Sequence, residues 1–180
     1  ELDPNNAEYY DARGTSYRAV GLYKEAISDF TQAIKLQPSN AQYYDLRGMI
    51  YHATGHYEEA IGDCTRAIEL EPSNADFYDS RGLLYHSAGR YEQAICDFSR
   101  AIELEPGYAE YFQLRGMCNY AVGQYTECIS DFTQAIGLEP DNATYYISRG
   151  MSYQAIGKHE EAIADASYLI ELEPTDDRYY

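Results

Sequence analysis

The chain has 180 residues, of which 45% are hydrophobic, so it is long enough to bury a substantial core within a single domain. Thirteen Lys and Arg residues against thirty Asp and Glu residues give a formal net charge of −17. This charge disfavours binding to nucleic acid or to anionic membranes and favours basic partners, although it would equally serve to keep the molecule in solution. No apolar run approaches the roughly 18 residues of a membrane-spanning helix, and we expect no targeting peptide at the N-terminus.

Prolines follow one another along the chain at a constant step of 34 residues, at Pro4, Pro38, Pro72, Pro106, Pro140 and Pro174. Two series of glycines, beginning at Gly14 and Gly21, keep the same step. This period divides the chain into five full units, 7–40, 41–74, 75–108, 109–142 and 143–176. Residues 1–6 and 177–180 then belong to partial flanking units, and we expect the chain to be a section of a longer array.

Each unit shows the apolar spacing of two helices separated by a glycine. In the first unit Tyr10, Gly14 and Tyr17 share one helix face, and Gly21 is expected to end that helix. The second helix should end before Pro38, which cannot donate the next intrahelical hydrogen bond. An asparagine precedes the first helix in four units and should cap it, at Asn6, Asn40, Asn74 and Asn142. We also expect Gly14 to let the second helix approach closely at its alanines, Ala26 and Ala33.

The pattern YxxxGxxY…A…F…A…P at this period resembles the tetratricopeptide repeat family, and the resemblance covers essentially the whole chain. In the first unit the matching residues are Tyr10, Gly14, Tyr17, Ala26, Phe30, Ala33 and Pro38. The resemblance implies an all-α fold, a right-handed superhelical solenoid of antiparallel helix pairs forming a single array over residues 1–180. Departures from the pattern, which we interpret as variations within the core, are Cys64, Asn119, Cys128, His159 and Ala166.

One arginine and one aspartate recur in each unit at positions that should lie on the inner sides of the two helices. An arginine cannot lose its charge there, so we expect ion pairs with tyrosine rings over the guanidinium groups. The spacing leaves open whether each pair forms within one unit or between neighbouring units, and the arginines could instead contact a ligand. The residues concerned are Arg13, Arg47, Arg81, Arg115 and Arg149, with Asp29, Asp63, Asp97, Asp131 and Asp165.

The resemblance also implies a concave groove lined by the second, fifth, ninth and twelfth residues of each unit. An acidic edge (Asp11, Asp45, Asp79) and a stripe of Met and Leu then run along it, which predicts a protein or peptide partner with basic and apolar residues. Alternatively, the Met and Leu residues pack between helices and the Asp residues are simply solvated. The predicted groove residues are Glu8, Asp11, Arg18, Asp45, Met49, His52, Asp76, Asp79, Leu83, His86, Glu110, Gln113, Met117, Tyr120, Ile147 and Met151.

Some family members bind the acidic C-terminus of chaperones through basic and polar groove residues. Here Asp11, Thr15, Leu46 and Asp76 occupy those positions, so we do not expect that partner. The chain contains none of the phosphate-loop, zinc-protease, serine-hydrolase or dinucleotide motifs, and we predict a protein–protein interaction scaffold that is not an enzyme. The alternatives are that the array positions a substrate for a larger enzyme or that it self-associates through its ends.

The four cysteines lack the spacing of a metal site or a disulfide framework. We interpret Cys64, Cys96, Cys118 and Cys128 as small buried residues in a reducing compartment. This predicts a cytoplasmic protein without metal or cofactor.

Overall fold

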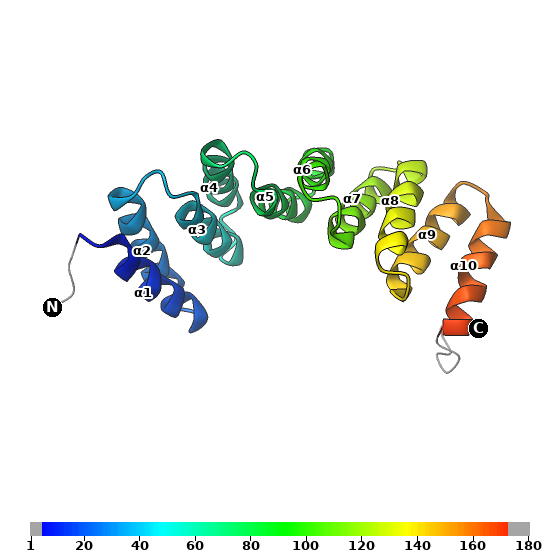
Figure 1. Cartoon of the computed structure of the whole chain (residues 1–180), viewed down its shortest axis with the longest axis horizontal. Helices are drawn as coiled ribbons and strands as arrows, with labels where there is room; N and C mark the ends of the chain where they lie inside the picture. The colour runs from blue at the N-terminus through cyan, green and yellow to red at the C-terminus, as the bar shows by residue number, and fades with distance from the viewer. Residues whose placement is uncertain (1–4, 173–180) are drawn as a thin grey trace. The chain divides into compact units, whose positions relative to one another are not determined.

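The computed structural model describes residues 5–172, and this part of the chain contains α-helices and no strand. The first helices of the repeats recur at one constant step along the sequence, and the second helices recur at the same step. Their order along the chain can be followed in Figure 1. The predicted flanking unit 177–180 lies outside the described residues. The helices are α1 (Ala7–Ala19), α2 (Tyr23–Leu36), α3 (Ala41–Ala53), α4 (Tyr57–Leu70), α5 (Ala75–Ser87), α6 (Tyr91–Leu104), α7 (Ala109–Ala121), α8 (Tyr125–Leu138), α9 (Ala143–Ala155) and α10 (His159–Leu172).

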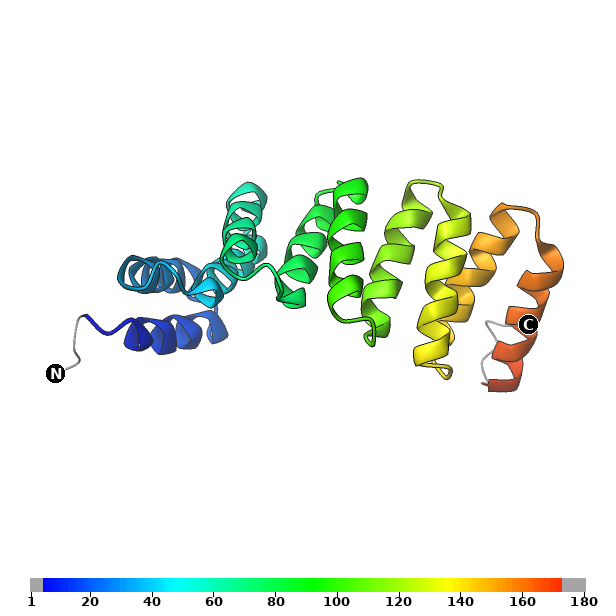
Figure 2. The ribbon, with the colours of Figure 1, turned by 45° about the horizontal axis from the view of Figure 1, so that its top comes forward.

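The chain divides between Gly89 and Arg90 into two compact units. In the first, α1 packs on α2 and α3 on α4, and each following first helix, α3 or α5, packs on the second helix before it. The second unit repeats this order, because α7 packs on α6 and α8, and α9 packs on α8 and α10. The views in Figures 1 and 2 both show α7, α8, α9 and α10 side by side within that unit.

The ends of the helices are set by the residues that the sequence pattern singles out. The four predicted asparagine caps accept hydrogen bonds from the backbone N–H two residues later, at 2.9 to 3.2 Å, whereas Tyr108 precedes α7 without a side-chain cap. The glycine after each first helix has φ between 71° and 79°, a left-handed conformation that disfavours any other residue.

Tyrosine hydroxyl groups add a connection between consecutive repeats that the sequence analysis did not anticipate. The hydroxyls of Tyr44, Tyr78 and Tyr146 donate to the carbonyl oxygens of the prolines six residues earlier, at 3.0 to 3.2 Å. Each bond satisfies a carbonyl in the turn that joins one repeat to the next. Part of the high tyrosine content therefore reflects anchoring of these turns.

The glycine in the middle of the first helix allows a close approach in the first, second and fourth repeats, and the residues that come nearest differ between repeats. At Gly48 a Cβ atom would lie 3.3 Å from the backbone oxygen of Ala60, the counterpart of the expected Ala26. A Cβ atom on Gly14 would lie 3.1 Å from the ring of Phe30 and 3.3 Å from the Cβ of Asp29. The expected neighbours, Ala26 and Ala33, do not make the closest approach. At Gly116 the distances from such a Cβ atom to the facing helix are shorter still.

Four of the predicted ion pairs form within repeats, between the first and second helices. The Nη2 atoms of Arg13, Arg47, Arg115 and Arg149 lie 2.6 to 2.7 Å from the carboxylate of the aspartate sixteen residues later, and the Nε atoms donate to the same carboxylates. These aspartate side chains are at most 10% exposed. Asp97 is also buried. Each pair is bidentate, so it fixes the position of the second helix as well as neutralising the buried carboxylate.

The third guanidinium nitrogen of these arginines reaches backward along the chain to the preceding repeat. The Nη1 atoms donate to side-chain hydroxyls on the preceding second helix, at 2.9 to 3.1 Å: Arg47 to Thr31, Arg81 to Thr65, Arg115 to Ser99 and Arg149 to Thr133. One arginine side chain therefore contacts its own helix pair and the previous repeat.

Aromatic rings lie over the guanidinium groups, as expected. The guanidinium carbon of Arg149 lies 5.5 and 5.9 Å from the ring centroids of Tyr146 and Tyr153, and Arg13 has the same two neighbours in Tyr10 and Tyr17. These contacts are cation–π interactions, which shield the charge on the side not used for hydrogen bonding.

Replacing Gly116 with alanine should destabilise the protein by about 1–3 kcal/mol, because the new Cβ would lie 3.0 Å from the ring of Phe132 and 3.2 Å from the Cβ of Asp131. Gly150→Ala is the matched control, since its Cβ would meet only the Cβ of Asp165 at 3.8 Å. This variant should be neutral or gain up to about 1 kcal/mol from the higher helix propensity of alanine. Urea denaturation followed by circular dichroism measures both, and equal effects would contradict the packing described.

Arg47→Leu should cost about 3 kcal/mol, because it leaves the carboxylate of Asp63 buried without its cation. Arg13→Leu should cost less, since the Arg13 side chain is 53% exposed against 17% for Arg47. The double variant Arg47→Leu with Asp63→Leu should recover most of the loss. Thermal unfolding midpoints of the three variants test this, and equal losses for the two arginines would be inconsistent with the burial.

Candidate partner-binding surface

The predicted groove residues differ widely in their accessibility. Eight are exposed and seven are partly exposed, whereas Asp45 is buried. The exposed members are Glu8, Met49, Asp76, Leu83, Glu110, Met117, Ile147 and Met151, and the partly exposed ones are Asp11, Arg18, His52, Asp79, His86, Gln113 and Tyr120.

The Met and Leu side chains at the ninth position of the units are accessible to solvent. Met49 is 42% exposed and Leu83 is 36% exposed in the first compact unit, and Met117 and Met151 are 40% and 48% exposed in the second. Packing within the chain therefore covers only part of these apolar side chains. They present flexible apolar surface at one register of the first helices.

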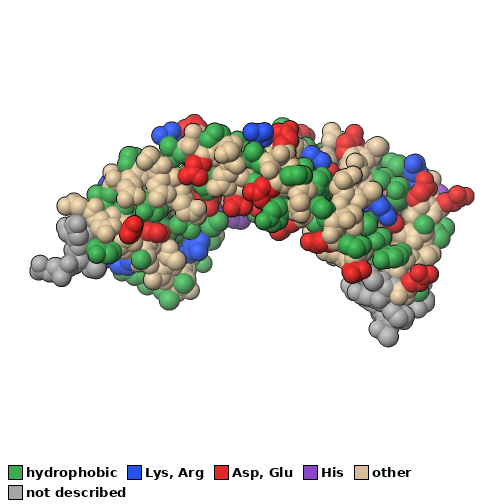
Figure 3. Space-filling model, in the orientation of Figure 1, with side chains coloured by type: hydrophobic (Ala, Val, Ile, Leu, Met, Phe, Trp, Pro, Cys, Tyr) green, Lys and Arg blue, Asp and Glu red, His purple; other side chains and the backbone are tan. Residues whose placement is uncertain are grey.

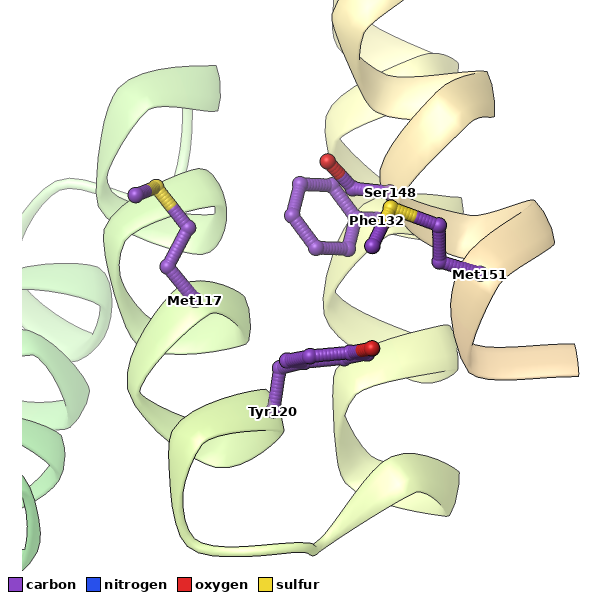
Figure 4. A pocket seen from close by; sticks show the side chains of 5 residues that line it. All are labelled: Met117, Tyr120, Phe132, Ser148 and Met151. Carbon is purple, nitrogen blue, oxygen red and sulfur yellow. The ribbon is translucent and has the colours of Figure 1, made fainter. Parts of the chain in front are cut away.

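In the second compact unit these side chains flank a pocket of about 160 Å³. Met117 and Tyr120 come from α7, Ser148 and Met151 come from α9, and Phe132 of α8 lies between them. Figure 4 shows Met117 and Met151 on the two sides of the pocket and Tyr120 along one end. The lining is mostly apolar, with a serine hydroxyl and a phenol as its polar groups.

The first compact unit has a counterpart of about 100 Å³ at equivalent positions two repeats earlier. Met49, Leu83 and Ser80 stand in the places of Met117, Met151 and Ser148, and His52 stands in the place of Tyr120. Cys64 replaces Phe132. The repeat thus builds the same kind of pocket twice with different walls.

The ring at one end of each pocket is held by an aromatic residue at the start of the second helix. Tyr120 meets Tyr125 edge-on, with ring centroids 5.3 Å apart, and His52 lies 5.8 Å from Tyr57. These ring contacts hold the side chain that forms this wall of the pocket.

The structure changes the interpretation of the acidic edge. Asp45 is 3% exposed, and its Oδ1 atom accepts a weak hydrogen bond from the thiol of Cys64 at 3.9 Å. Burial raises the pKa of Asp45, and a hydrogen bond from Ser80 partly offsets this effect. The carboxylate therefore cannot form part of a solvated wall. The exposed acids of this surface lie instead at the second position of the units, at Glu8, Asp76 and Glu110.

Acidic side chains are distributed widely over the face of the molecule shown in Figure 3, among a smaller number of basic ones. This distribution agrees with the formal net charge of −17. Several of the basic groups visible in the structure are engaged in ion pairs with neighbouring carboxylates, including Arg66 with Glu69 and Arg100 with Glu103.

The cysteines are free thiols, and three of the four are buried as expected. Cys96 is exposed, contrary to that expectation, because it lies on the outer side of α6. Burial raises the pKa of Cys118 to about 12, which leaves it unreactive at neutral pH. Within residues 5–172 there is no group of three or more His, Cys, Asp or Glu side chains suited to a metal ion. No described helix combines the length and hydropathy needed to span a bilayer.

Comparison with known proteins agrees with the geometry. Models of the tetratricopeptide repeat match residues 12–75 and 114–177, and a further one matches residues 64–95. No curated protein sequence matches the chain. The helix pairs and the matched repeats define an α-helical repeat solenoid, the fold class that the sequence predicted. The chain belongs to the tetratricopeptide repeat family.

Solved structures with the same fold cover nearly the whole chain. A crystal structure of MamA is 24% identical with a TM-score of 0.88, covering 96% of this chain and 94% of that one. YrrB, described as a TPR protein with an unusual peptide-binding site, is 23% identical with a TM-score of 0.83, covering 97% and 90%. MamA residues 41 to the end from Desulfovibrio magneticus RS-1 are 18% identical with a TM-score of 0.85, covering 95% and 97%. At these identities the similarity establishes the fold alone.

Asp45→Asn should stabilise the protein at neutral pH, because it removes a carboxylate that burial disfavours in its charged form. The folded-state pKa of Asp45 is raised above its unfolded value, so the penalty is absent below about pH 4 and is complete once the pH exceeds the folded-state pKa. The gain in urea midpoint over the parent chain should therefore shrink as the pH is lowered to about 4. Asp141→Asn, at an exposed site, controls for the reduction in net charge. A gain independent of pH, or one matched by the control, would contradict this account.

Proposed function

We propose that the chain is a protein-interaction scaffold that binds a segment of a partner protein along its first helices. The observation that carries this proposal is the pair of equivalent pockets, each flanked by two exposed apolar side chains at the same register. Contiguous exposed apolar surface with preformed pockets is typical of recognition sites. The peptide-binding site named in the description of YrrB supports the same kind of role for this fold.

The partner segment that fits this surface best carries apolar side chains together with Lys or Arg. Its apolar side chains would enter the pockets beside Met117 and Met151 or beside Met49 and Leu83. Its basic groups would meet the exposed carboxylates at the second position of the units, such as Asp76 and Glu110. An acidic chain end would be repelled by the same groups.

The pocket walls support binding rather than catalysis. They consist of thioethers, aromatic or imidazole rings and hydroxyl groups, which provide contact area and a few hydrogen bonds. A cytoplasmic location is part of the proposal, since the free thiols agree with a reducing compartment.

Peptides selected from a random display library against the chain should contain Lys or Arg near one or two large apolar residues. The double variant Met117→Ser with Met151→Ser should weaken peptides that bind this pocket by about tenfold or more, because it removes both flanking thioethers. Raising the salt concentration should weaken binding further, since exposed charges are screened. Fluorescence anisotropy of labelled peptides measures both effects.

Ile163→Ser is the matched control, because Ile163 is 64% exposed and lies outside the predicted groove. It belongs to α10, the second helix of the last repeat. It should leave the affinity unchanged. Selection of acidic peptides, or equal losses in the control and the Met variants, would refute the proposed surface.

A further inference from the structure

The fourth repeat lacks a ring that the other repeats place beside the central arginine. Tyr17, Tyr51, Tyr85 and Tyr153 occupy equivalent positions, and their ring centroids lie 5.8 to 5.9 Å from the guanidinium carbons of their repeats. Asn119 stands at this position in the fourth repeat. It is buried, and its Nδ2 atom donates to Oδ2 of Asp131 at 2.9 Å.

A cavity of about 290 Å³ lies beside Asn119, between α6, α7 and α8. Its walls include Ser99, Arg115, Gln124 and Ser130. In the second repeat the ring of Tyr51 lies 6.1 Å from that of His56, which occupies the place of Gln124. The pocket therefore lies beside the residues that take the places of Tyr51 and His56 in the fourth repeat.

The hydrogen-bonding needs of the arginine in this cavity are already met. The Nε and Nη2 atoms of Arg115 donate to Asp131, and Nη1 donates to Ser99. An incoming anion would also face the carboxylates of Asp131 and Glu127. What the site lacks, compared with Arg13 and Arg149, is the second aromatic ring, because Phe112 at 5.8 Å supplies the first. A guanidinium attracts the face of an aromatic ring even when its N–H groups are engaged.

We propose that this cavity, which we call the aromatic slot (Ser99, Arg115, Asn119, Gln124, Glu127 and Ser130), binds a tyrosine or phenylalanine side chain of a partner polypeptide. The bound ring takes the place that an internal tyrosine occupies in the other repeats. Gln124 and Glu127 are exposed at the slot and supply acceptors for a phenol hydroxyl. The slot is separate from the Met117 pocket, because the slot is formed with α6 and the pocket with α9.

The test uses the isotope-labelled chain and two blocked tripeptides, acetyl-Gly-Tyr-Gly-amide and acetyl-Gly-Leu-Gly-amide. The tyrosine peptide should shift the amide resonances of Ser99, Arg115 and Gln124. The leucine peptide should bind about tenfold more weakly, because it has no π-face for the guanidinium. Equal binding of the two peptides, or no shift at these residues with millimolar tyrosine peptide, would overturn the proposal.

Asn119→Tyr should abolish these shifts, because the chain then fills the slot with its own ring. Should that variant fail to fold, Ser130→Trp blocks the slot from an exposed position on α8. The reverse change, Tyr51→Asn, should open a second slot and produce new shifts at Thr31 and Arg47. Tyrosine-peptide shifts that persist in a folded blocking variant would show that the ring binds elsewhere.

Discussion

The guanidinium groups in the middle of the first helices determine where the neighbouring helices can lie. An arginine side chain stays protonated at physiological pH. Once it is partly buried, its N–H groups therefore need hydrogen-bond acceptors in the fixed directions in which they point. Two of its nitrogens donate hydrogen bonds to the carboxylate on the following helix. The third nitrogen donates to a hydroxyl group of the preceding repeat. The large core rings lie next to these aspartates in sequence, as Phe30 follows Asp29 and Phe132 follows Asp131. Placing the carboxylate therefore also places the ring against the glycine of the facing helix.

The proposed binding surface depends on this same framework of ion pairs. The ion pairs hold the two helices of a repeat in a constant geometry. Residues at the same position of different first helices therefore lie at equivalent places on the surface of their repeats. Met49 and Met117 thus reach equivalent pockets, although they lie in different compact units. The residues that line the pocket can then differ between repeats, as Cys64 differs from Phe132 and His52 from Tyr120, while the helices keep their positions. The residues that line these two pockets differ from those that form the ion pairs of the repeat.

The periodic prolines, glycines and asparagines were sufficient to predict the helices and their ends, because these features depend on local backbone preferences and on helical spacing. The Met and Leu groove positions were expected only from the resemblance to the family, and packing between helices was the alternative. The sequence did not decide which arginine pairs with which aspartate, since Asp29 is nearly equidistant along the chain from Arg13 and Arg47. Only the lateral offset of the helices in the structure selects Arg13 as its partner. Hydroxyl side chains recur at Thr31, Thr65, Ser99 and Thr133, and this periodicity is the sequence signal for the contacts between repeats. The burial of Asp45 depends on Ser80 and Cys64, which belong to other helices, so no local pattern reports it. Cys96 was wrongly expected to be buried, because residue type alone does not give the side of a helix on which a thiol lies.

The hydroxyl bonds made by the arginines of the second to fifth repeats all point toward the preceding repeat, and this gives the array a direction. Every repeat offers a donor at its leading side and an acceptor at its trailing side, so any two repeats joined in sequence order bring the same chemical groups together. Duplication or loss of a whole 34-residue segment would regenerate a complete junction, whereas a shorter insertion would not. Such a chain can change its length in evolution by whole repeats, and it can gain or lose a specific contact by a single replacement, as at Asn119, without redesigning its neighbours.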